Sequence, residues 1–589
     1  MYCHEKNPIA SATASVVKRT TLILLVTTLS FVVPVEGQTT ATRDALSPSM
    51  SATPAPQGSI VLDPVVFGPG AVGTVQTKTV SGTLNVNTPP NPLPSTSPDW
   101  VYLPVDVPRG VSAISVSYSY DKPTVPPGVL GNAMDVGMFD QRGIQLGETS
   151  GFRGWSGGAR TSFSISASDA TPGYLPGPIG SGRWYVIFGP YTIAPQGLNW
   201  AADITLSYGP EGTPFVPNYA PDSATGRGHA WYRGDMHLHT VFSDGKYLPE
   251  DIVSRARTAG LDFIVSSEHN TSSAHGIWGN FAQPDLLIIN GEEITTRNGH
   301  YNAYGLPNGK WIDWRYRATD DNAFVHFVNE IHQSGALAVA NHPYCSYIAC
   351  FWKFGYGHVD AVEVWNSPWS TWDESALAEW DNQLVAVTKS RSTTWLPAVG
   401  ASDAHRDPEV VGLPQVVVLA DDLERTAILD GVRSGQLWIS ESSKVNLTFT
   451  AQGGAATAGI GQRLSVDPST EITVTLTVSG VEGCSGQSLS QSVESALLQN
   501  ATQVPEYQDE PVAPGNFTTS TTGCSVRLIT DQGQVLETSL AETGDGTITF
   551  TTSPARSRYI RAEVRRLQPD PVIPATMVAF TNPIFLGSI

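Results

Sequence analysis

His237 and His239 stand two residues apart where an apolar run meets a polar turn, in the stretch RGDMHLHTVFSD at residues 233–244. On a β-strand, residues i and i+2 point to the same face of the sheet. Both imidazoles can therefore reach one metal ion. Asp403 and His405, in SDAH, repeat the same spacing and offer a second same-face pair.

Histidines and carboxylates follow several other apolar runs of the same region. They are Asp244 in SDG, His269 in EHN, Glu293 in GEEIT, His300 in GHYN and His342 in NHP. One histidine at a strand end is usually a packed or surface residue, but a whole set at one end of a sheet is hard to explain that way. Nitrogen and carboxylate donors together suit Zn²⁺, Mn²⁺ or Fe, whereas Ca²⁺ takes oxygen ligands. We expect one to three divalent ions per chain, with a metal-activated water that attacks a phosphorus or carbonyl centre.

The elements that must position these side chains form a predicted α/β array. Strand-like runs lie at residues 231–239, 261–267, 286–295, 336–341, 359–365, 396–402 and 415–419, and helix-like runs at 249–259, 320–333, 370–388 and 421–434. Pro249, followed by two acidic residues, is typical of a helix start. Seven strands with interposed helices predict a parallel seven-stranded barrel, in which the chemistry gathers at the carboxyl ends of the strands.

The sequence on either side of this predicted barrel, residues 229–440, has a different character. Short alternating or β-branched runs between Gly and Pro turns fill residues 58–208 and again 441–589, and both regions predict β-sandwiches. Turn residues at 209–228 predict a linker, and the Ser/Thr/Ala/Pro-rich segment 38–57 predicts a disordered one. The expected fold class is therefore multidomain, α/β plus all-β.

Residues 1–37 have the pattern of a secretory signal peptide. Lys18 and Arg19 precede an apolar run at residues 22–35, and small residues follow near Gly37. The run is short for a membrane span. We expect a secreted, extracellular protein, with a retained signal anchor as the alternative.

Four cysteines remain once that segment is removed, an even number that suits an oxidising compartment. We expect two local disulfides, Cys345–Cys350 and Cys484–Cys524; four free thiols are the alternative. Glycosylation sequons that predict a glycoprotein occur at Asn270, Asn446, Asn500 and Asn516. Asn270 lies too near the proposed ligands to be counted as glycosylated.

The formal charge of −20 argues against a nucleic-acid partner, because a polyanion would have to approach against this field. No second apolar run follows the first, so we expect no membrane association after signal cleavage. The expected partner is a small-molecule ester substrate. The sequence leaves the oligomeric state open.

Taken in order, HLH…SDG, EHN, GEEIT, GHYN, NHP and SDAH resemble the motifs of the polymerase and histidinol phosphatase (PHP) metallohydrolases. The resemblance covers residues 231–440 and implies a distorted seven-stranded α/β barrel. The flanking β-domains, residues 151–180 and the closing FTNPIF look like a secreted branch that includes carbaryl hydrolase-like enzymes.

Carried over residue by residue, the resemblance implies nine metal ligands: His237, His239, Asp244, His269, Glu293, His300, His342, Asp403 and His405. The family's usual Thr-Asp-His is here Ser267–Glu268–His269, which keeps the histidine and lengthens its acidic neighbour. Glu293 is preferred to Glu292 because the family pattern places the ligand two residues after the glycine.

Three residues are expected to act on the substrate. Asp403 or a histidine such as His405 is predicted to move the proton, and Arg406 to contact an anionic substrate group, with a surface role as its alternative. Asn366 and Tyr344 are candidates for lining the pocket, against packing or turn roles. The histidines that fit no motif are predicted to be ordinary ones: His275, His326, His332 and His358.

The sequence thus predicts a secreted metal-dependent hydrolase of a phosphoester, or of a carboxylic or carbamic ester. The competing hypothesis is a non-catalytic extracellular binding protein whose metal ions only stabilise the fold. The size of the ligand set favours the enzyme, because structural metal sites rarely need so many donors.

Overall fold

The computed structural model describes residues 55–85, 99–390, 392–484, 523–568, 572 and 575–588. From Thr53 onward the chain forms one compact unit. The predicted signal peptide, most of the linker at residues 38–57, and the sequons at Asn500 and Asn516 lie outside the described residues. Within the described part, no helix is both long and apolar enough to cross a membrane.

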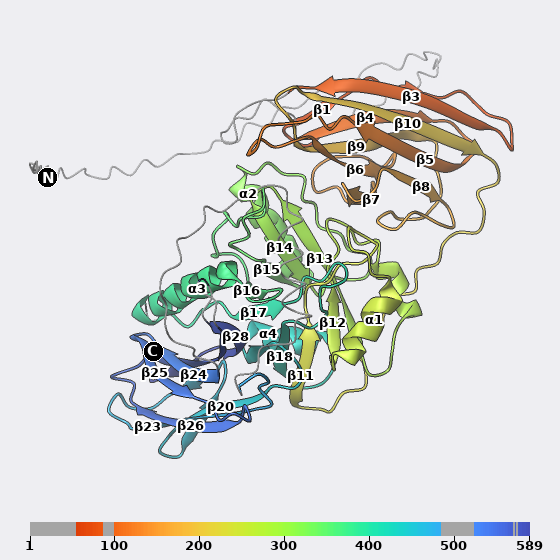
Figure 1. The fold of residues 1–589 in the computed structure, drawn as a ribbon. Coiled ribbons are helices and arrows are strands. Elements are labelled where there is room, and N and C mark those ends of the chain that lie inside the picture. Colours follow the sequence, from red (N-terminus) through yellow and green to blue (C-terminus); the bar gives the residue numbers. More distant parts are fainter. Residues whose placement is uncertain are drawn as a thin grey trace, which may run out of the picture. The chain divides into compact units, whose positions relative to one another are not determined.

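Two sheets pack face to face in the N-terminal part (Figure 1). The first has the order β1 (Ser59–Val61), β4 (Trp100–Val107), β9 (Gly182–Thr192), β6 (Ala133–Phe139) and β7 (Phe152–Gly157), with β2 (Val65–Val66) beside β4. The second has the order β3 (Val75–Leu84), β10 (Leu198–Tyr208), β5 (Val111–Tyr120) and β8 (Ser162–Ser166). Buried and exposed residues alternate along β10, as expected for a strand with one face in a core.

A mixed sheet forms the central part of the chain. Its order is β17 (Ala398–Ala401), β16 (Ala361–Asn366), β15 (Leu337–Ala340), β14 (Gly299–Tyr304), β13 (Leu287–Thr296), β12 (Phe263–Ser266), β11 (Ala230–Asp235) and β18 (Gln415–Ala420).

The prediction of a parallel array is wrong at two strands. The unpredicted β14 pairs antiparallel with both β13 and β15. The predicted barrel strand at residues 415–419 is β18, which pairs antiparallel with β11 and leads out of the central part.

The ladder of these strands is open between β17 and β11, so the closed barrel that was predicted is not seen. The segments that follow the two strands nevertheless meet, since Leu238 and Ala404 form a parallel bridge. The Asp403 amide donates to the His237 carbonyl at 2.9 Å, and the His239 amide donates to the Ala404 carbonyl at 3.1 Å. The two same-face pairs noted in the sequence therefore lie on neighbouring segments.

The four predicted helices are present: α1 (Pro249–Thr258), α2 (Asp321–Gln333), α3 (Thr371–Ser390) and α4 (Arg425–Arg433). A short 3₁₀ helix, η1, spans His275–Asn280. The Asp251 carboxylate accepts the Leu248 amide at 3.0 Å where α1 begins, and Asp320 accepts the Ala323 amide at 3.0 Å where α2 begins. Helix α2 packs against β15, α3 against β16 and α4 against β18 (Figure 1).

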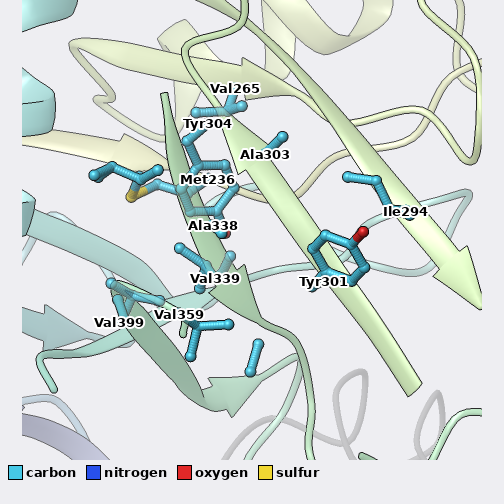
Figure 2. Close-up of a cluster of buried hydrophobic side chains, with 14 of the residues drawn as sticks. Met236, Val265, Ile294, Tyr301, Ala303, Tyr304, Ala338, Val339, Val359 and Val399 are labelled. Carbon is cyan, nitrogen blue, oxygen red and sulfur yellow. The ribbon is translucent and has the colours of Figure 1, made fainter. Parts of the chain in front are cut away.

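An apolar core lies beneath the strand ends of the central sheet. Figure 2 shows part of it, with Met236, Val265, Tyr301, Val339 and Val399 among its side chains. Met236 directly precedes His237 and is fully buried in this core. The segment that carries the two histidines is therefore anchored on packed apolar side chains.

The central sheet continues into the C-terminal part without a break. After β18 come β19 (Leu437–Ser440), β28 (Ala575–Thr581), β27 (Tyr559–Leu567), β24 (Gly523–Thr530) and β25 (Gly533–Ser539), with β22 (Arg463–Leu464) and β29 (Ile584–Leu586) off this path. A second sheet has the order β21 (Ala456–Gly459), β20 (Asn446–Gly453), β23 (Ile472–Ser479) and β26 (Gly546–Thr552). The predicted disulfides Cys345–Cys350 and Cys484–Cys524 are both present.

The first N-terminal sheet and the central part share one core. The ring of Phe152 stacks on that of Trp311 with centroids 4.0 Å apart. Arg315 is fully buried between the two, where it pairs with Asp313 at 2.7 Å and donates to the Tyr102 hydroxyl at 2.8 Å. This packing fixes the first N-terminal sheet against the central part.

Candidate metal centre

Four donor atoms of His237, His239, Glu293 and Asp403 converge at the strand ends. Nε2 of His237 lies 3.3 Å from both Glu293 Oε2 and Asp403 Oδ1, and Nε2 of His239 lies 3.4 and 3.1 Å from the same oxygens. All four atoms are buried, and none has a hydrogen-bond partner among the described residues. Ligands held about 2.0–2.2 Å from a tetrahedral ion lie roughly 3.3–3.6 Å apart, so these four N–O separations are close to those of donors that share one divalent cation.

Asp244 is the centre of a second set of donors. Its Oδ1 lies 3.6 Å from His269 Nε2 and 3.4 Å from His405 Nε2, and it too is buried without a hydrogen-bond partner in the described chain. Ligand atoms of these three residues and of His239 lie within 4.8 Å of one another. His269 and His405 beside the Asp244 carboxylate are suited to a second cation, while Nε2 of His239 lies between the two sets and can serve only one of them.

Glu293 also connects to a third set through its other oxygen. Its Oε1 lies 3.2 Å from His300 Nδ1 and 3.2 Å from His342 Nε2, and Nε2 of His300 is buried and unpartnered among the described residues. Cys350 Sγ lies 3.3 Å from His342 Nδ1, but its disulfide with Cys345 leaves no thiolate to bind a metal. The two oxygens of Glu293 thus face different donors, as a bridging carboxylate requires. The structure brings all nine predicted ligand side chains together.

Glu363 holds two of the histidines and was not identified from the sequence. Its Oε1 lies 3.0 Å from His237 Nδ1, and its Oε2 accepts the His342 amide at 3.0 Å. Asn366 donates to Glu363 at 3.0 Å and to Asp403 Oδ2 at 3.2 Å, which leaves Asp403 Oδ1 facing the histidines. The available signal was a carboxylate between two valines in an apolar strand, because a charge buried there needs partners.

Glu268, the lengthened acidic residue, supports the turn that leads to Asp244. Its carboxylate accepts the Thr240 amide at 3.1 Å and the hydroxyls of Thr240 and Ser243 at 2.5 Å each. The extra methylene therefore reaches across to residues 240–243. This turn sets the position from which Asp244 enters the second donor set.

Backbone conformations of positive φ cluster around the site. Asn270, His342, Ser367 and Asp403 have φ values of 53°, 25°, 60° and 51°, and each follows a central strand. Such non-glycine conformations cost about 1–3 kcal/mol each and persist where the surroundings hold them. Two of the four residues are predicted ligands, so the strain lies where side chains must be aimed.

The charges inside the cluster act differently on its members: the carboxylates raise the pKa of His237 and His269 above 6.5 despite burial, whereas Glu293 and His239 are in the protonation states that bind cations. Burial opposes ionisation of Glu293, but the charges of His269 and His237 hold its pKa well below the usual range. Burial, together with the charges of His405 and His269, lowers the pKa of His239 to about 3. Glu293 is therefore anionic and His239 neutral near pH 7, which is what metal binding requires.

Glu292 points away from the cluster and accepts the Ile312 amide at 2.8 Å, in agreement with the preference for Glu293 as the ligand. Arg406 lines the cavity described below with a side chain 59% exposed, whereas Tyr344 and Asn366 line a separate small pocket. Asn270 is buried and its side chain bonds the Thr295 backbone, which fits the expectation that it carries no glycan.

The four histidines predicted to be ordinary belong to none of the donor groups of the described residues. His275 Nε2 lies 2.9 Å from the Gly291 carbonyl, and His332 pairs with Asp360 at 2.8 Å.

A cavity of about 440 Å³ opens beside the cluster. Asp244, His269 and His300 belong to its wall, with Arg297, Trp314 and Tyr316 from the central part. The N-terminal sheet supplies further wall residues, which include Asp135, Trp155, Gly157, Gly158 and Tyr191. Sequence analysis did not place any of the N-terminal residues in a site, because no local pattern marks them.

Comparison with protein families gives no match for this chain, and comparison with curated proteins gives none either. Among solved structures, it is similar to a two-domain protein from Bacteroides vulgatus that contains a predicted PHP-like metal-dependent phosphoesterase, at 15% identity over 63% of this chain and 100% of that one, with a TM-score of 0.29. It is also similar to an amidohydrolase from Chromobacterium violaceum with bound sulfate, at 14% identity over 30% of this chain and 89% of that one, with a TM-score of 0.22. At these identities and TM-scores, any functional conclusion rests on the side chains of the site.

Proposed function

We propose that this chain is a secreted metal-dependent hydrolase that cleaves small-molecule esters, with phosphoesters as the leading class. The observation that carries the proposal is the set of four buried, unpartnered donor atoms of His237, His239, Glu293 and Asp403, with N–O separations of 3.1–3.4 Å. Such atoms are costly to bury unless a cation joins them. The adjoining cavity is large enough for a small ester.

Divalent ions held by these residues would supply Lewis-acid polarisation of the scissile ester and of water. The chain itself does the positioning. Glu363 turns the His237 ring, Asn366 turns the Asp403 carboxylate, and Glu268 holds the turn before Asp244. The cluster is therefore arranged before a substrate arrives, which lowers the cost of organising it during the reaction.

Proton movement is assigned to His405. Its Nδ1 lies 2.7 Å from the Asp403 carbonyl, so Nδ1 carries the hydrogen and Nε2 faces Asp244. Burial lowers its pKa, but the charge of Asp244 outweighs that effect and holds the pKa at about 10. A cation bound by Asp244 would compete with the proton for Nε2, so His405 acts either as a ligand or as a proton-transfer group and not as both at once.

The cavity also offers positive charge for an anionic group. Lys246 and Arg406 both line the cavity. Lys246 follows Asp244 closely in the sequence, and Arg406 directly follows the SDAH segment. This favours a phosphoester over a neutral carboxylic or carbamic ester. A carbamic ester is the alternative substrate for the same residues.

The two disulfides support the secreted location, because disulfides persist in oxidising compartments.

An ester panel tests the proposal. Protein loaded with Zn²⁺, Mn²⁺ or Fe²⁺ is assayed with p-nitrophenyl phosphate, bis-p-nitrophenyl phosphate, a naphthyl carboxylic ester and a naphthyl carbamate, and again after chelation. We expect chelator-sensitive turnover, highest for a phosphoester, that is lost in His239→Ala and kept in the control His332→Ala, which alters a histidine outside the cluster. A folded, metal-loaded protein that is inert to every class would favour a binding protein instead.

A further inference from the structure

The cavity beside the ligand cluster is completed by residues far from it in the sequence. Asp135 lies on β6, Trp155 and Gly157 on β7, and Tyr191 on β9, all in the first N-terminal sheet. The opposite wall holds His269 and Asp244. Burial raises the pKa of Asp135 to about 7, and the charges of Arg297 and then His269 oppose that rise. The N-terminal sheet therefore faces the position at which a substrate's reacting group would lie.

The Asp135 carboxylate is open to this cavity. It is half-buried, and it has no hydrogen bond or ion pair with any described residue. A Cβ at Gly158 would lie 3.3 Å from its Oδ1, so a larger residue there would crowd the carboxylate, whereas one at Gly157 would lie 3.9 Å from it in ordinary contact. Gly157 also has a φ of +52°, which other residues rarely adopt. Gly158 therefore keeps the approach to Asp135 clear, and Gly157 provides the backbone conformation beside it.

Aromatic side chains surround this approach. Trp155 packs edge-on against Trp100 at 5.9 Å and against Trp314 at 4.7 Å, and all three line the cavity. Tyr191 lines it as well, and the charge of Asp135 acts on its hydroxyl. Aromatic faces beside a carboxylate favour a cationic group, above all an alkylammonium.

The other charged groups of the N-terminal wall do not compete for this role. Asp99 is paired with Arg317 at 3.0 Å and with Arg297 at 3.6 Å, and Arg297 also donates to the Pro190 carbonyl at 2.7 Å. Of the two N-terminal acids that line the cavity, only Asp135 is unpaired among the described residues. The charge of Arg297 acts on Asp135 without forming an ion pair with it, so a ligand cation in direct contact would stabilise this half-buried carboxylate further.

We propose that the N-terminal sheet is the specificity element of this hydrolase and that Asp135 binds an ammonium group on the substrate. The substrate class is then a phosphodiester or other ester of an amino alcohol, with its scissile group at the ligand cluster and its ammonium at Asp135. This inference rests on the proposed function for the reaction, but the recognition of the cation is separable from it.

The test compares two chromogenic phosphodiesters that differ in one charge. Metal-loaded protein is assayed with p-nitrophenylphosphocholine and with ethyl p-nitrophenyl phosphate, in wild type and in Asp135→Asn. We expect kcat/KM for the choline ester to fall about 10- to 100-fold relative to that for the ethyl ester in the variant. A matched control, Asp203→Asn, removes the same charge from β10 outside the cavity and should leave the ratio unchanged. An unaltered ratio in Asp135→Asn would overturn the inference.

A binding measurement separates this inference from the proposed reaction. Phosphocholine and ethyl phosphate are titrated calorimetrically into metal-loaded wild type and into Asp135→Asn, with circular dichroism to confirm that both are folded. Tighter binding of phosphocholine that depends on Asp135 would support the cation site even if neither ester were cleaved. Equal binding of the two ligands by wild type would reject the site even if both esters were cleaved.

Discussion

Nδ1 of His237 lies 3.0 Å from Oε1 of Glu363, and this contact turns the other ring nitrogen toward Glu293 and Asp403. We predict that Glu363→Gln lowers metal affinity about 10- to 100-fold, because the carboxylate both orients the ring and makes it a stronger donor. Competition with a chromophoric chelator measures this. Glu292→Gln is the matched control. Burial raises the pKa of Glu292 well above its usual value, so this side chain is a neutral acid outside the cluster, and replacing it by an amide changes no charge. Equal affinities in the two variants would contradict the role of Glu363.

Glu268→Asp should weaken metal binding at one donor set more than at the other. The shorter side chain withdraws from the hydroxyls of Thr240 and Ser243, and Asp244 follows directly after that turn. We expect the donor set of Asp244, His269 and His405 to weaken while the set that contains His237 is kept. Metal stoichiometry at limiting free metal should fall without reaching zero. Uniform loss of all metal, or none, would show that the turn does not act on Asp244 alone.

Arg315→Met should destabilise the whole compact unit. Arg315 and Asp313 are both fully buried, so the substitution leaves a carboxylate without its cation and removes a donor from Tyr102. We expect a loss of about 3–5 kcal/mol in the free energy of unfolding, measured by urea titration. The double variant Arg315→Met/Asp313→Asn should recover part of it. A single variant as stable as wild type would mean that this pair does not hold the N-terminal sheet in place.

His275 should make stability depend on pH. Burial lowers its pKa from 6.5 to about 4, and its Nδ1 is buried without a partner among the described residues. The unfolded chain therefore binds more protons between these two pH values, so the contribution to stability is present above pH 6.5 and is lost as the pH falls toward 4. The loss is at most about 3 kcal/mol. His275→Gln should flatten the unfolding free energy across this range by that amount, and parallel curves for variant and wild type would refute the assignment.

The sequence predicted the ligand side chains well where they directly follow a β-strand. The pairs at His237 and His239 and at Asp403 and His405 share a face only because each lies on an extended segment, and the structure places these segments side by side. In the unpredicted β14 the polar residues His300 and Asn302 alternate with the apolar Tyr301 and Ala303, but this run is only four residues long. It nevertheless pairs on both sides, which no local pattern reveals.

The cavity was beyond prediction for a different reason. Asp135 and Arg297 both line the cavity, although they are 162 positions apart in the sequence (297 minus 135). Their proximity depends on the packing of Phe152 and Arg315 between the N-terminal sheet and the central part. Sequence periodicity describes single elements and carries no information about which faces of two sheets will meet.

The central claim is that the converging donors hold divalent cations, and elemental analysis of the purified full chain tests it most directly. After incubation with Zn²⁺, Mn²⁺ or Fe²⁺ and removal of free metal, inductively coupled plasma mass spectrometry should find at least one ion per chain for wild type. The variant His239→Ala should bind fewer, because His239 belongs to two donor sets. A folded wild-type protein that retains none of the three metals would contradict the account.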